Sequence, residues 1–468
     1  MSTLVLRDAE VDGVLVDVGV DGGRVTSIGP ARSLPGADVE IDCAGGAVLP
    51  GLHDHHLHLL SMAAATGSVD VAVDLDGSLR AAHAAAPPGA AIRAVNYDEM
   101  GEGALDRWRL DALAPGRPVR VQHRSGALWV LSTVALEQAG IVDAREEGIE
   151  RDEQDRPTGR LYRLDGWLHD RLTPPDASRT ADGTALGAVG RRLASYGVTG
   201  VTDCTPTASV DYFEALAGAV RAGQLPVTVA STGGPELSTT YPPAPLRRGP
   251  VKVLISDHAL PALGDLREWF QRAHRAGRPV AVHCVTRTAL LLALAAWREV
   301  GSVPGDRIEH ASVTPAEAVS ALAGLSLTVV TQPAFVAARG DVYLAEVEPS
   351  DRPDLYRCGS LIDAGVAVGG STDAPFGPED PWVAVRAAVE RRAPSGAVVG
   401  RDRGLAPTSA LDLFLGPLEH PGGPARRVRS GVPADLCVLD APLGTVLLEP
   451  SSRHVAATIW GGTCTFAA

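Results

Sequence analysis

The chain has 468 residues, of which 45% are hydrophobic and 21% are charged, and its formal net charge is −14. This composition predicts a globular protein, since it is too hydrophobic for a disordered chain and has no apolar run of about 18 residues that could span a membrane. The acidic balance and the lack of a basic cluster argue against nucleic acid and anionic membranes as partners. We therefore expect a small-molecule partner.

The cysteines and the N-terminal segment indicate the compartment. The six cysteines lie far apart with no Cys-x-x-Cys spacing, so neither a zinc knuckle nor a disulfide framework is predicted. The first residues are typical of a strand and lack the pattern of a signal peptide. We expect a cytoplasmic protein; the sequence does not define its oligomeric state, and a homo-oligomer is compatible with it.

Both ends of the chain predict short β-strands. Near the N-terminus, the apolar runs Leu4–Leu6 and Val14–Val20 are followed by Asp-Gly turns, and near the C-terminus the apolar runs Ala434–Asp440 and Val455–Trp460 are bounded by Gly and Pro. We expect residues 1–49 and 404–468 to pair into one composite domain, a small β-sandwich.

Between these ends, short β-branched runs alternate with helix-length segments rich in Ala, Leu and Arg, which is typical of βα units around a parallel sheet. Eight runs have the character of strands: His53–Leu59, Val198–Asp203, Val227–Ser231, Val251–Ile255, Val280–His283, Ile308–Ala311, Leu327–Thr331 and Val366–Gly370. Eight such units predict an α/β fold, a closed (β/α)8 TIM-like barrel over residues 50–403. The alternative, an open doubly wound nucleotide-binding sheet, would need a Gly-rich phosphate turn that the sequence lacks.

The first two predicted strands are separated by more than a hundred residues, which is too long for one crossover. We expect an inserted subdomain over residues 61–190. By its position after the first strand, it would lie over the strand ends, where barrel active sites form.

Four histidines lie between positions 53 and 58. Because side chains alternate along a strand, only one of the pairs His53/His55 and His56/His58 can face the barrel interior. We assign His56 and His58, with Asp54 on the same face, because they lie nearer the C-terminal strand end. Two imidazoles at this spacing suit Zn²⁺. For His53 and His55 a structural role is favoured.

Polar residues also occur at the ends of later strands, where packing alone would favour apolar ones: Lys252, His283, His310 and Asp373. The C-terminal strand ends of a barrel converge on one mouth, so these residues are expected to meet His56 and His58. Lys252 is the only lysine in the chain, the other 41 basic residues being arginine. Coding bias explains the arginines without any function and leaves Lys252 unexplained, unless it pairs with a carboxylate such as Asp203 or Asp257.

With these residues, the sequence resembles the amidohydrolase superfamily over nearly its whole length. The matching pieces are Pro50-Gly51-x-x-Asp54-x-His56-x-His58, Gly197-Val198-Thr199, Val282-His283, Arg307-Ile308-Glu309-His310-Ala311, Gln332-Pro333, Gly370-Ser371-Thr372-Asp373-Ala374-Pro375 and Gly431-Val432-Pro433-Ala434-Asp435-Leu436. It looks most similar to the amidohydrolase-3 branch, which includes N-substituted formamide deformylases. In that branch a long insert follows the first strand.

The resemblance implies a role for each residue of the centre: His56 and His58 bind one metal ion, His283 and His310 bind a second, Lys252 bridges them as a carbamate, and Asp373 is ligand and proton shuttle. The expected cofactor is a divalent metal ion, by default zinc, with one or two per chain. A lysine can become neutral when buried and add carbon dioxide, whereas a guanidinium stays charged.

Substrate contacts are expected from the insert and from the segments after late strands. The candidates are Tyr97, Asp98, His123, Trp129, Phe335 and Phe376. Aromatic side chains near one mouth would suit an apolar acyl or N-aryl group.

The resulting function is metal-dependent hydrolysis of a C–N bond in an amide or formamide-like small molecule. One alternative is a mononuclear deaminase of a heterocycle, which shares the His-x-His pair and Asp373 but does not need Lys252. The fifth strand ends without the nearby glutamate that a deaminase would use. The other alternative is a non-catalytic regulator that kept the fold.

Overall fold

The computed structural model describes residues 3–172, 183–206, 210–234, 245–257 and 259–468. The chain forms two compact units, one comprising Met1–Leu59 with Gly187–Ala468 and the other Leu60–Leu186. Among the described residues we find no helix with the length and hydrophobicity that a bilayer crossing requires.

The first unit is built around an eight-stranded parallel sheet with the order β19-β18-β17-β16-β15-β14-β13-β6. Its strands are β6 (Leu52–Leu57), β13 (Val198–Asp203), β14 (Thr228–Gly233), β15 (Arg247–Leu254), β16 (Val280–Cys284), β17 (Arg307–His310), β18 (Thr328–Thr331) and β19 (Val368–Gly370). Each predicted barrel strand overlaps one of them. The β-branched runs form strands because their side chains fill the barrel on one side and pack under the helices on the other.

Hydrogen bonds between β6 and the residues after β19 join the two ends of this sheet. Asp373 N donates to the carbonyl of His56 at 2.8 Å, and His58 N donates to the carbonyl of Ala374 at 2.8 Å. The predicted TIM-like barrel is therefore confirmed, and the open doubly wound sheet is excluded.

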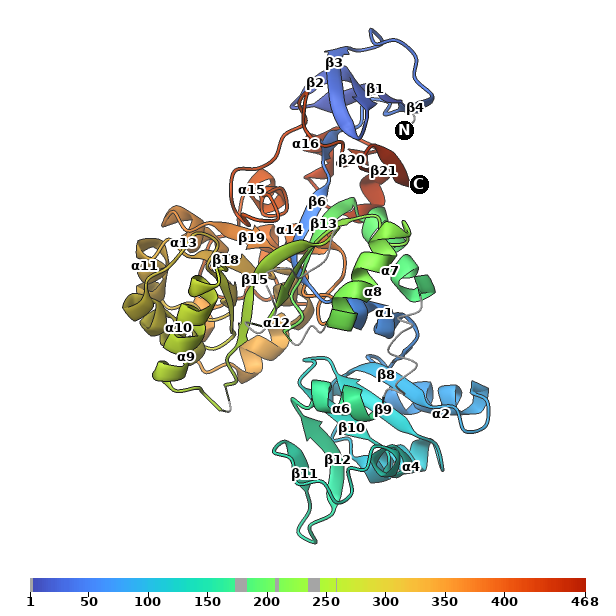
Figure 1. Ribbon diagram of the computed structural model, residues 1–468, viewed down its shortest axis with the longest axis vertical. Helices are drawn as coiled ribbons and strands as arrows, with labels where there is room; N and C mark the ends of the chain where they lie inside the picture. Colours follow the sequence, from blue (N-terminus) through green and yellow to red (C-terminus); the bar gives the residue numbers. More distant parts are fainter. Residues whose placement is uncertain (1–2, 173–182, 207–209, 235–244, 258) are drawn as a thin grey trace. The chain divides into compact units, whose positions relative to one another are not determined.

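Helices cover the outside of the barrel, as Figure 1 shows for α9 to α11 in yellow-green. Their apolar faces turn inward: α9 (Leu263–Arg275) buries Leu266, Phe270 and Ala273. The other helices of this unit are α7 (Gly183–Ser195), α8 (Val210–Arg221), α10 (Arg287–Val300), α11 (Ala316–Gly324), α12 (Ala334–Glu346), α13 (Cys358–Asp363), α14 (Pro381–Glu390), α15 (Pro407–Asp412) and α16 (Leu443–Val446).

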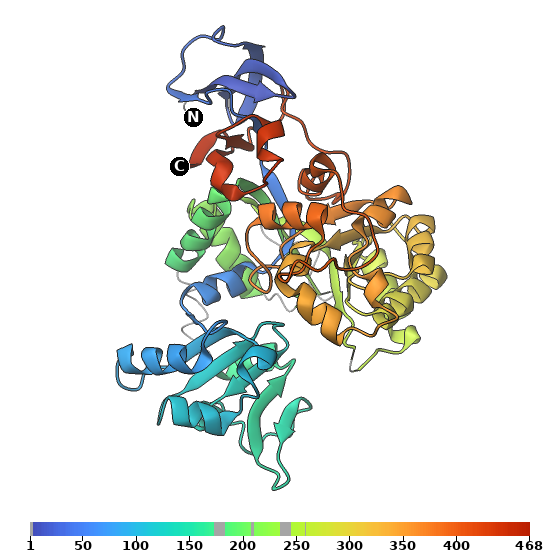
Figure 2. The same ribbon diagram turned by 180° about the vertical axis from the view of Figure 1, so that it is seen from behind.

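The chain ends form two four-stranded sheets, which lie side by side in both ribbon views (Figures 1 and 2). One has the order β3-β2-β1-β4 and the other β22-β21-β20-β5. The strands are β1 (Leu4–Val11), β2 (Val14–Asp21), β3 (Arg24–Pro30), β4 (Val39–Asp42), β5 (Val48–Pro50), β20 (Leu436–Leu439), β21 (Val455–Trp460) and β22 (Thr463–Ala467). Leu6 and Val18 share one hydrophobic core with Leu436 and Ile459, so the two ends stabilise each other.

The second unit contains a six-stranded sheet with the order β11-β12-β10-β9-β8-β7. Its strands are β7 (Val69–Asp70), β8 (Ile92–Tyr97), β9 (Val119–His123), β10 (Leu128–Leu131), β11 (Ile149–Arg151) and β12 (Pro157–Tyr162), and its helices include α1 (Leu59–Thr66), α2 (Leu75–Ala85), α3 (Glu99–Glu102), α4 (Arg107–Leu113), α5 (Thr133–Gln138) and α6 (Asp165–Leu172). A core of its own, including Leu79, Ala94 and Val121, holds this unit together.

Candidate metal centre

Three of the predicted ligands, on β6 and just after β19, form a tight cluster. His58 Nε2 lies 3.2 Å from Asp373 Oδ1, and His56 Nε2 lies 3.6 Å from the same oxygen. The potential ligand atoms of these three residues all lie within 4.8 Å of one another. Such spacing allows one cation to contact all three.

The other three predicted residues lie against this cluster. The ring centroid of His310, at the end of β17, is 4.9 Å from that of His56 and 4.4 Å from that of His283 on β16. His310 Nδ1 is 3.9 Å from Asp373 Oδ2, and Lys252 Nζ on β15 is 3.5 Å from His56 Nε2. The structure thus brings all six residues of the predicted centre together at the C-terminal ends of the strands.

The backbone is strained at two of these residues. His310 and Asp373 adopt positive φ angles of 71° and 57°, a region that L-residues rarely occupy. Such conformations cost on the order of 1–3 kcal/mol each and cluster at functional sites.

A buried carboxylate fixes the orientation of His56. Glu309 Oε2 accepts a hydrogen bond from His56 Nδ1 at 2.6 Å, and Arg307 Nε donates to Glu309 Oε1 at 2.6 Å. Glu309 is fully buried, and burial alone would raise its pKa, but Arg307 and His56 hold that pKa well below its usual range. An ionised Glu309 keeps the proton on Nδ1, which leaves Nε2 of His56 as a lone-pair donor.

A second chain of hydrogen bonds orients His58. Its Nδ1 lies 3.3 Å from Thr205 Oγ1, which lies 2.8 Å from the hydroxyl of Tyr212; that hydroxyl donates to Asp203 Oδ2 at 2.6 Å. Because the chain ends on a carboxylate, every donor can point the same way, from His58 toward Asp203. Nε2 of His58 again remains free to bind a cation.

The same logic applies to His310. Its Nδ1 lies 2.9 Å from Gln332 Oε1, while Gln332 Nε2 donates to Ser371 Oγ at 2.9 Å and Ser371 Oγ donates to the carbonyl of Thr331 at 3.1 Å. Since the amide oxygen of Gln332 can only accept, Nδ1 of His310 is the donor.

The electrostatics suit a divalent cation. Burial lowers the pKa of His56 to about 3, helped by the charge of Lys252, and burial also lowers the pKa of His283 and His310. Burial alone would raise the pKa of Asp373, but the neighbouring imidazoles of His58, His56 and His310 hold it below its usual range. Neutral imidazoles beside a carboxylate form the donor set that zinc and similar ions prefer, so the residues fit a metal.

Lys252 has no carboxylate partner among the described residues. Asp203 is bonded to Tyr212 and to Leu59 N, and Asp257 accepts a hydrogen bond from Thr286 Oγ1 at 2.5 Å. The simple ion pair considered above is therefore not formed. Lys252 is 7% exposed, and its Nζ lies 3.5 Å from His56 Nε2.

His53 and His55 lie on the opposite face of β6, as strand alternation predicts. His53 Nδ1 lies 2.9 Å from the carbonyl of Gly416, and its ring packs so closely on Gly200 that a Cβ there would come within 2.5 Å of it. His55 is fully buried, and neither ring nitrogen has a partner in the described structure. Asp54 accepts a hydrogen bond from Thr372 N at 3.2 Å and so supports the loop that carries Asp373.

The late aromatic candidates differ in their surroundings. The ring centroid of Phe376 is 5.4 Å from that of His58, which places it beside the cluster. Phe335 is 5% exposed and packs in a hydrophobic cluster with Val313 and Tyr356. The neighbouring Trp382 is fully buried and donates its indole N–H to a backbone carbonyl, so it has a structural role.

The candidates in the inserted unit have partners within it. The Tyr97 hydroxyl donates to the carbonyl of Gly103 at 2.6 Å, and Asp98 pairs with Arg124 at 2.8 Å. His123 Nδ1 lies 2.8 Å from Ser125 Oγ, and Trp129 packs in a core of that unit. Their contact with substrate stays a prediction.

The sequence did not identify the residues behind the ligands. Glu309 and Gln332 belong to motifs that the resemblance matches, so a signal existed, although no role was assigned to them. Thr205 and Tyr212 gave no signal, because their role depends on how α8 packs against β13.

A (β/α)8 barrel whose C-terminal mouth gathers imidazoles and a carboxylate is the arrangement in which barrel enzymes bind a catalytic metal ion. The model of the amidohydrolase family matches residues 39–466, so the chain belongs to this family. As a member it is a hydrolase that acts on carbon–nitrogen bonds, the enzyme class that the sequence predicted.

Several known proteins are similar to the chain. The N-substituted formamide deformylase of Arthrobacter pascens is 26% identical over 485 residues, covering 90% of this chain and 89% of that protein. An uncharacterized metal-dependent hydrolase of Pyrococcus horikoshii OT3 has a TM-score of 0.75 at 22% identity, covering 97% of this chain and 100% of that one. A mutant of atrazine chlorohydrolase from Arthrobacter aurescens TC1, complexed with zinc and atraton, has a TM-score of 0.58 at 14% identity, with 99% and 95% covered. At these identities the two solved structures support the fold alone.

Proposed function

We propose that the chain is a metal-dependent amidohydrolase that cleaves the C–N bond of an amide or formamide-like small molecule with an activated water. The observation that carries this proposal is that the imidazoles of His56, His58 and His310 each have Nδ1 at a hydrogen-bond acceptor, which leaves Nε2 for a cation beside Asp373. The formamide part is supported by the similarity to the deformylase of Arthrobacter pascens.

In this proposal the residues that hold the metal are His56, His58, His283, His310 and Asp373, with Lys252 between the two histidine pairs. Zinc is the default ion, with one or two per chain. A metal ion bound there lowers the pKa of a water molecule and polarises the scissile carbonyl.

Asp373 carries out the proton transfer. Its carboxylate, held ionised by the imidazoles around it, accepts a proton from the attacking water and delivers it to the departing nitrogen. An amine needs this proton because its anion is a poor leaving group. Phe376, beside His58, would pack against the apolar part of the substrate.

Lys252 is proposed to act as a carbamate. Its neutral amine adds to carbon dioxide: an N–C bond forms, one C=O π bond of carbon dioxide opens and one N–H proton is released. The product carries a single negative charge shared by two oxygens. This conversion would place an anionic ligand beside His56 Nε2, where it can bind a cation. A small-molecule substrate, a cytoplasmic location and homo-oligomer formation remain part of the same proposal.

The test is a screen of purified, metal-quantified enzyme against formamides, N-acyl amines, cyclic amides and aminopurines. We expect turnover of an amide or formamide that is lost in Asp373→Asn while the metal content is at least partly retained. Activity on aminopurines alone would instead identify a deaminase.

A further inference from the structure

A cavity of about 240 Å³ lies on the opposite side of the barrel from the metal centre. It is lined by residues at the N-terminal ends of strands, His53 on β6, Thr228 on β14 and Arg247 on β15, and by the segment 417–436 that leads into β20. The metal-site residues lie toward the other ends of the same strands. The cavity is therefore separate from the proposed active site.

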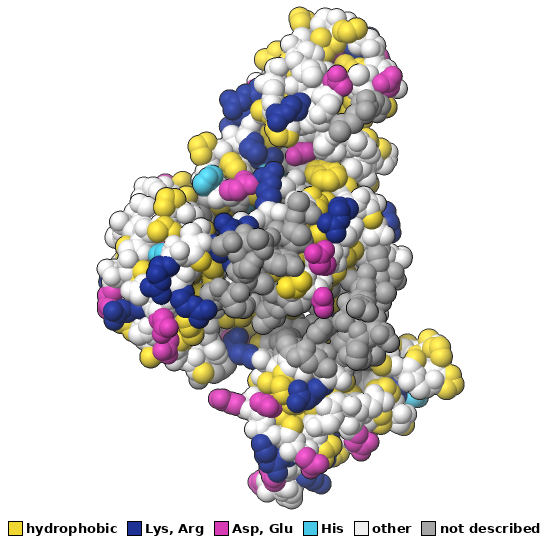
Figure 3. All heavy atoms as spheres, in the orientation of Figure 1, with side chains coloured by type: hydrophobic (Ala, Val, Ile, Leu, Met, Phe, Trp, Pro, Cys, Tyr) yellow, Lys and Arg dark blue, Asp and Glu magenta, His cyan; other side chains and the backbone are white. Residues whose placement is uncertain are grey.

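The cavity is positively charged, unlike the chain as a whole. Four arginines and two carboxylates line it: Arg247, Arg426, Arg427, Arg429, Glu419 and Asp435. Two positive charges are thus left in excess in a chain whose formal charge is −14. Figure 3 shows arginine side chains gathered on this face, between the end strands and the barrel.

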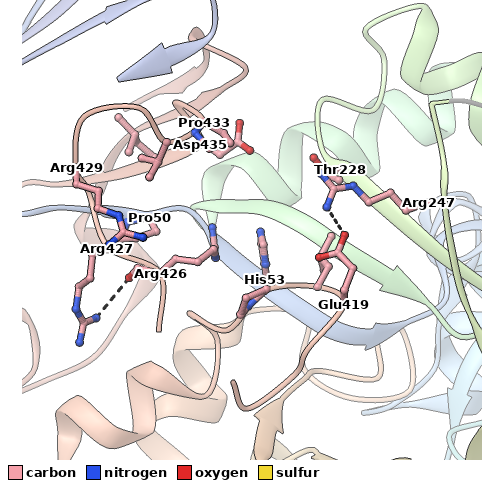
Figure 4. A pocket seen from close by; sticks show the side chains of 14 residues that line it. Pro50, His53, Thr228, Arg247, Glu419, Arg426, Arg427, Arg429, Pro433 and Asp435 are labelled. Atoms are coloured by element: carbon pink, nitrogen blue, oxygen red, sulfur yellow. Dashed lines mark hydrogen bonds and ion pairs between the residues drawn. The ribbon is translucent and has the colours of Figure 1, made fainter. Parts of the chain in front are cut away.

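Arg426 lies deepest and is incompletely neutralised. Its Nη2 donates to the carbonyl of Gly51 at 2.5 Å and its Nε to that of Leu415 at 3.1 Å, so its hydrogen bonds go to neutral groups. Burial lowers the pKa of Arg426 to about 10, which Asp435 and Glu419 only partly offset. In Figure 4 its guanidinium points into the same space as the His53 ring, and Arg426 is a main cause, after burial, of the lowered pKa of His53.

The remaining arginines differ in how they are paired. Arg247 is paired with Glu419, and Arg427 lies 3.7 Å from Asp412, whereas Arg429 is exposed and forms no ion pair with any described residue. The cavity therefore offers one free guanidinium at its rim and one partly neutralised guanidinium inside. Guanidinium groups bind carboxylate and phosphate oxygens in a bidentate manner.

We propose that this cavity binds a small anion bearing phosphate or carboxylate groups, held between Arg426 and Arg429. Its volume is below the roughly 300–1,000 Å³ of sites for drug-sized ligands, so a compact metabolite fits better than a macromolecule. The bound anion would supply the negative charge that the inner guanidinium lacks. It would also touch His53, on the strand that carries His56 and His58.

The experiment is isothermal titration calorimetry of the full chain with inorganic phosphate, citrate and glycerol. Phosphate, citrate or both should bind and glycerol should not; the anion with the higher affinity identifies the chemical source. Arg429→Glu should weaken binding at least about tenfold, because it places a carboxylate at the rim. The matched control is Arg272→Glu on α9, an exposed arginine without an ion pair among described residues, which should change binding less than about twofold.

Hydrogen exchange locates the site independently of catalysis. The anion should slow exchange in residues 413–436 of the wild type and not in Arg429→Glu. Absence of binding by both anions, equal weakening in the two arginine variants, or binding that persists in Arg429→Glu would each overturn the proposal. The last result would place the anion at the metal centre instead.

Discussion

His56 Nδ1 and Glu309 Oε2 lie 2.6 Å apart in the closed interior of the barrel, and Arg307 compensates the charge of Glu309. This pair determines which nitrogen of His56 faces the metal centre. A barrel interior is normally apolar, so an ion pair there is costly unless it positions something.

Glu309→Gln should therefore impair both folding and metal binding. The amide leaves Arg307 buried without a counter-charge, a change that costs about 3–5 kcal/mol in comparable cases. It also no longer holds the proton of His56 on Nδ1. Loss of such a hydrogen-bond partner typically lowers metal affinity about 10–100-fold. Urea denaturation and metal titration measure the two effects. Glu317→Gln, at an exposed carboxylate on α11, is the control, and equal behaviour of the two variants would refute this role.

Tyr212→Phe should weaken metal binding without preventing folding. The variant removes the hydroxyl that links Thr205 to Asp203, at a cost of about 1–3 kcal/mol for the unmade hydrogen bonds. Since Thr205 can still accept from His58, the loss of metal affinity should be smaller than in Glu309→Gln. Metal titration of both variants compares them directly, and a larger loss in Tyr212→Phe would contradict the proposed order.

Lys252→Arg should be inactive although it keeps a positive charge. A guanidinium cannot be carboxylated, and it would place a permanent cation 3.5 Å or so from imidazole Nε2 atoms. Lys252→Ala should also be inactive, but acetate or propionate should partly restore turnover by filling the vacated space. Elemental analysis should show less metal in both variants. Normal turnover and metal content in Lys252→Arg would mean that no carbamate is needed.

Removal of the metal should abolish turnover, because the residues of the centre offer no other activated nucleophile. Chelation followed by gel filtration should give an inactive protein, and zinc or manganese should restore its activity. Elemental analysis provides the check. Full activity with far less than one metal ion per chain would exclude the proposed mechanism.

The metal-free protein should lose stability as the pH falls below about 6.5. The pKa values of five histidines are lowered, mainly by desolvation, so these side chains take up protons on unfolding: His53, His55, His56, His283 and His310. Burial raises the pKa of Asp54 to about 7, so this carboxyl group is protonated in the folded state at these pH values. It releases about one proton on unfolding, which partly cancels the uptake by the histidines. The unfolded state binds more protons overall. The free energy of unfolding is therefore highest above pH 6.5 and decreases as the pH falls below this value.

Urea denaturation between pH 5 and pH 6.5 measures this slope, which is about 1.4 kcal/mol per pH unit for each proton. We expect a net uptake of about three protons. His55→Leu, which removes a buried ring without partners among described residues, should lower the uptake by about one. A slope near zero in the wild type would show that these histidines are already protonated in the folded state.

The barrel could be predicted from sequence because each strand is an apolar run with turn residues at its ends. The ligands could be predicted because a polar side chain at the end of such a run has no packing reason to be there. The chain of hydrogen bonds from His58 to Asp203 could not be predicted. It joins side chains of a loop, a helix and a strand, and the hydrophobic periodicity of the sequence does not indicate how these side chains meet. The cationic cavity was missed for a similar reason: Arg426, Arg427 and Arg429 lie close together in sequence, but no pattern in the sequence places them beside Arg247 and His53.

The hydrogen bonds that join the two ends of the barrel sheet come from the ligand-bearing residues themselves, from Asp373 N to the His56 carbonyl and from His58 N to the Ala374 carbonyl. An insertion or deletion that shifts the backbone of one of these ligands along its strand would therefore also displace the bonds that join the ends of the sheet. The segments beyond the strand ends do not form these bonds and are not subject to this constraint. We therefore expect changes of substrate preference to arise in those segments, with the ligands kept at their places on the strands.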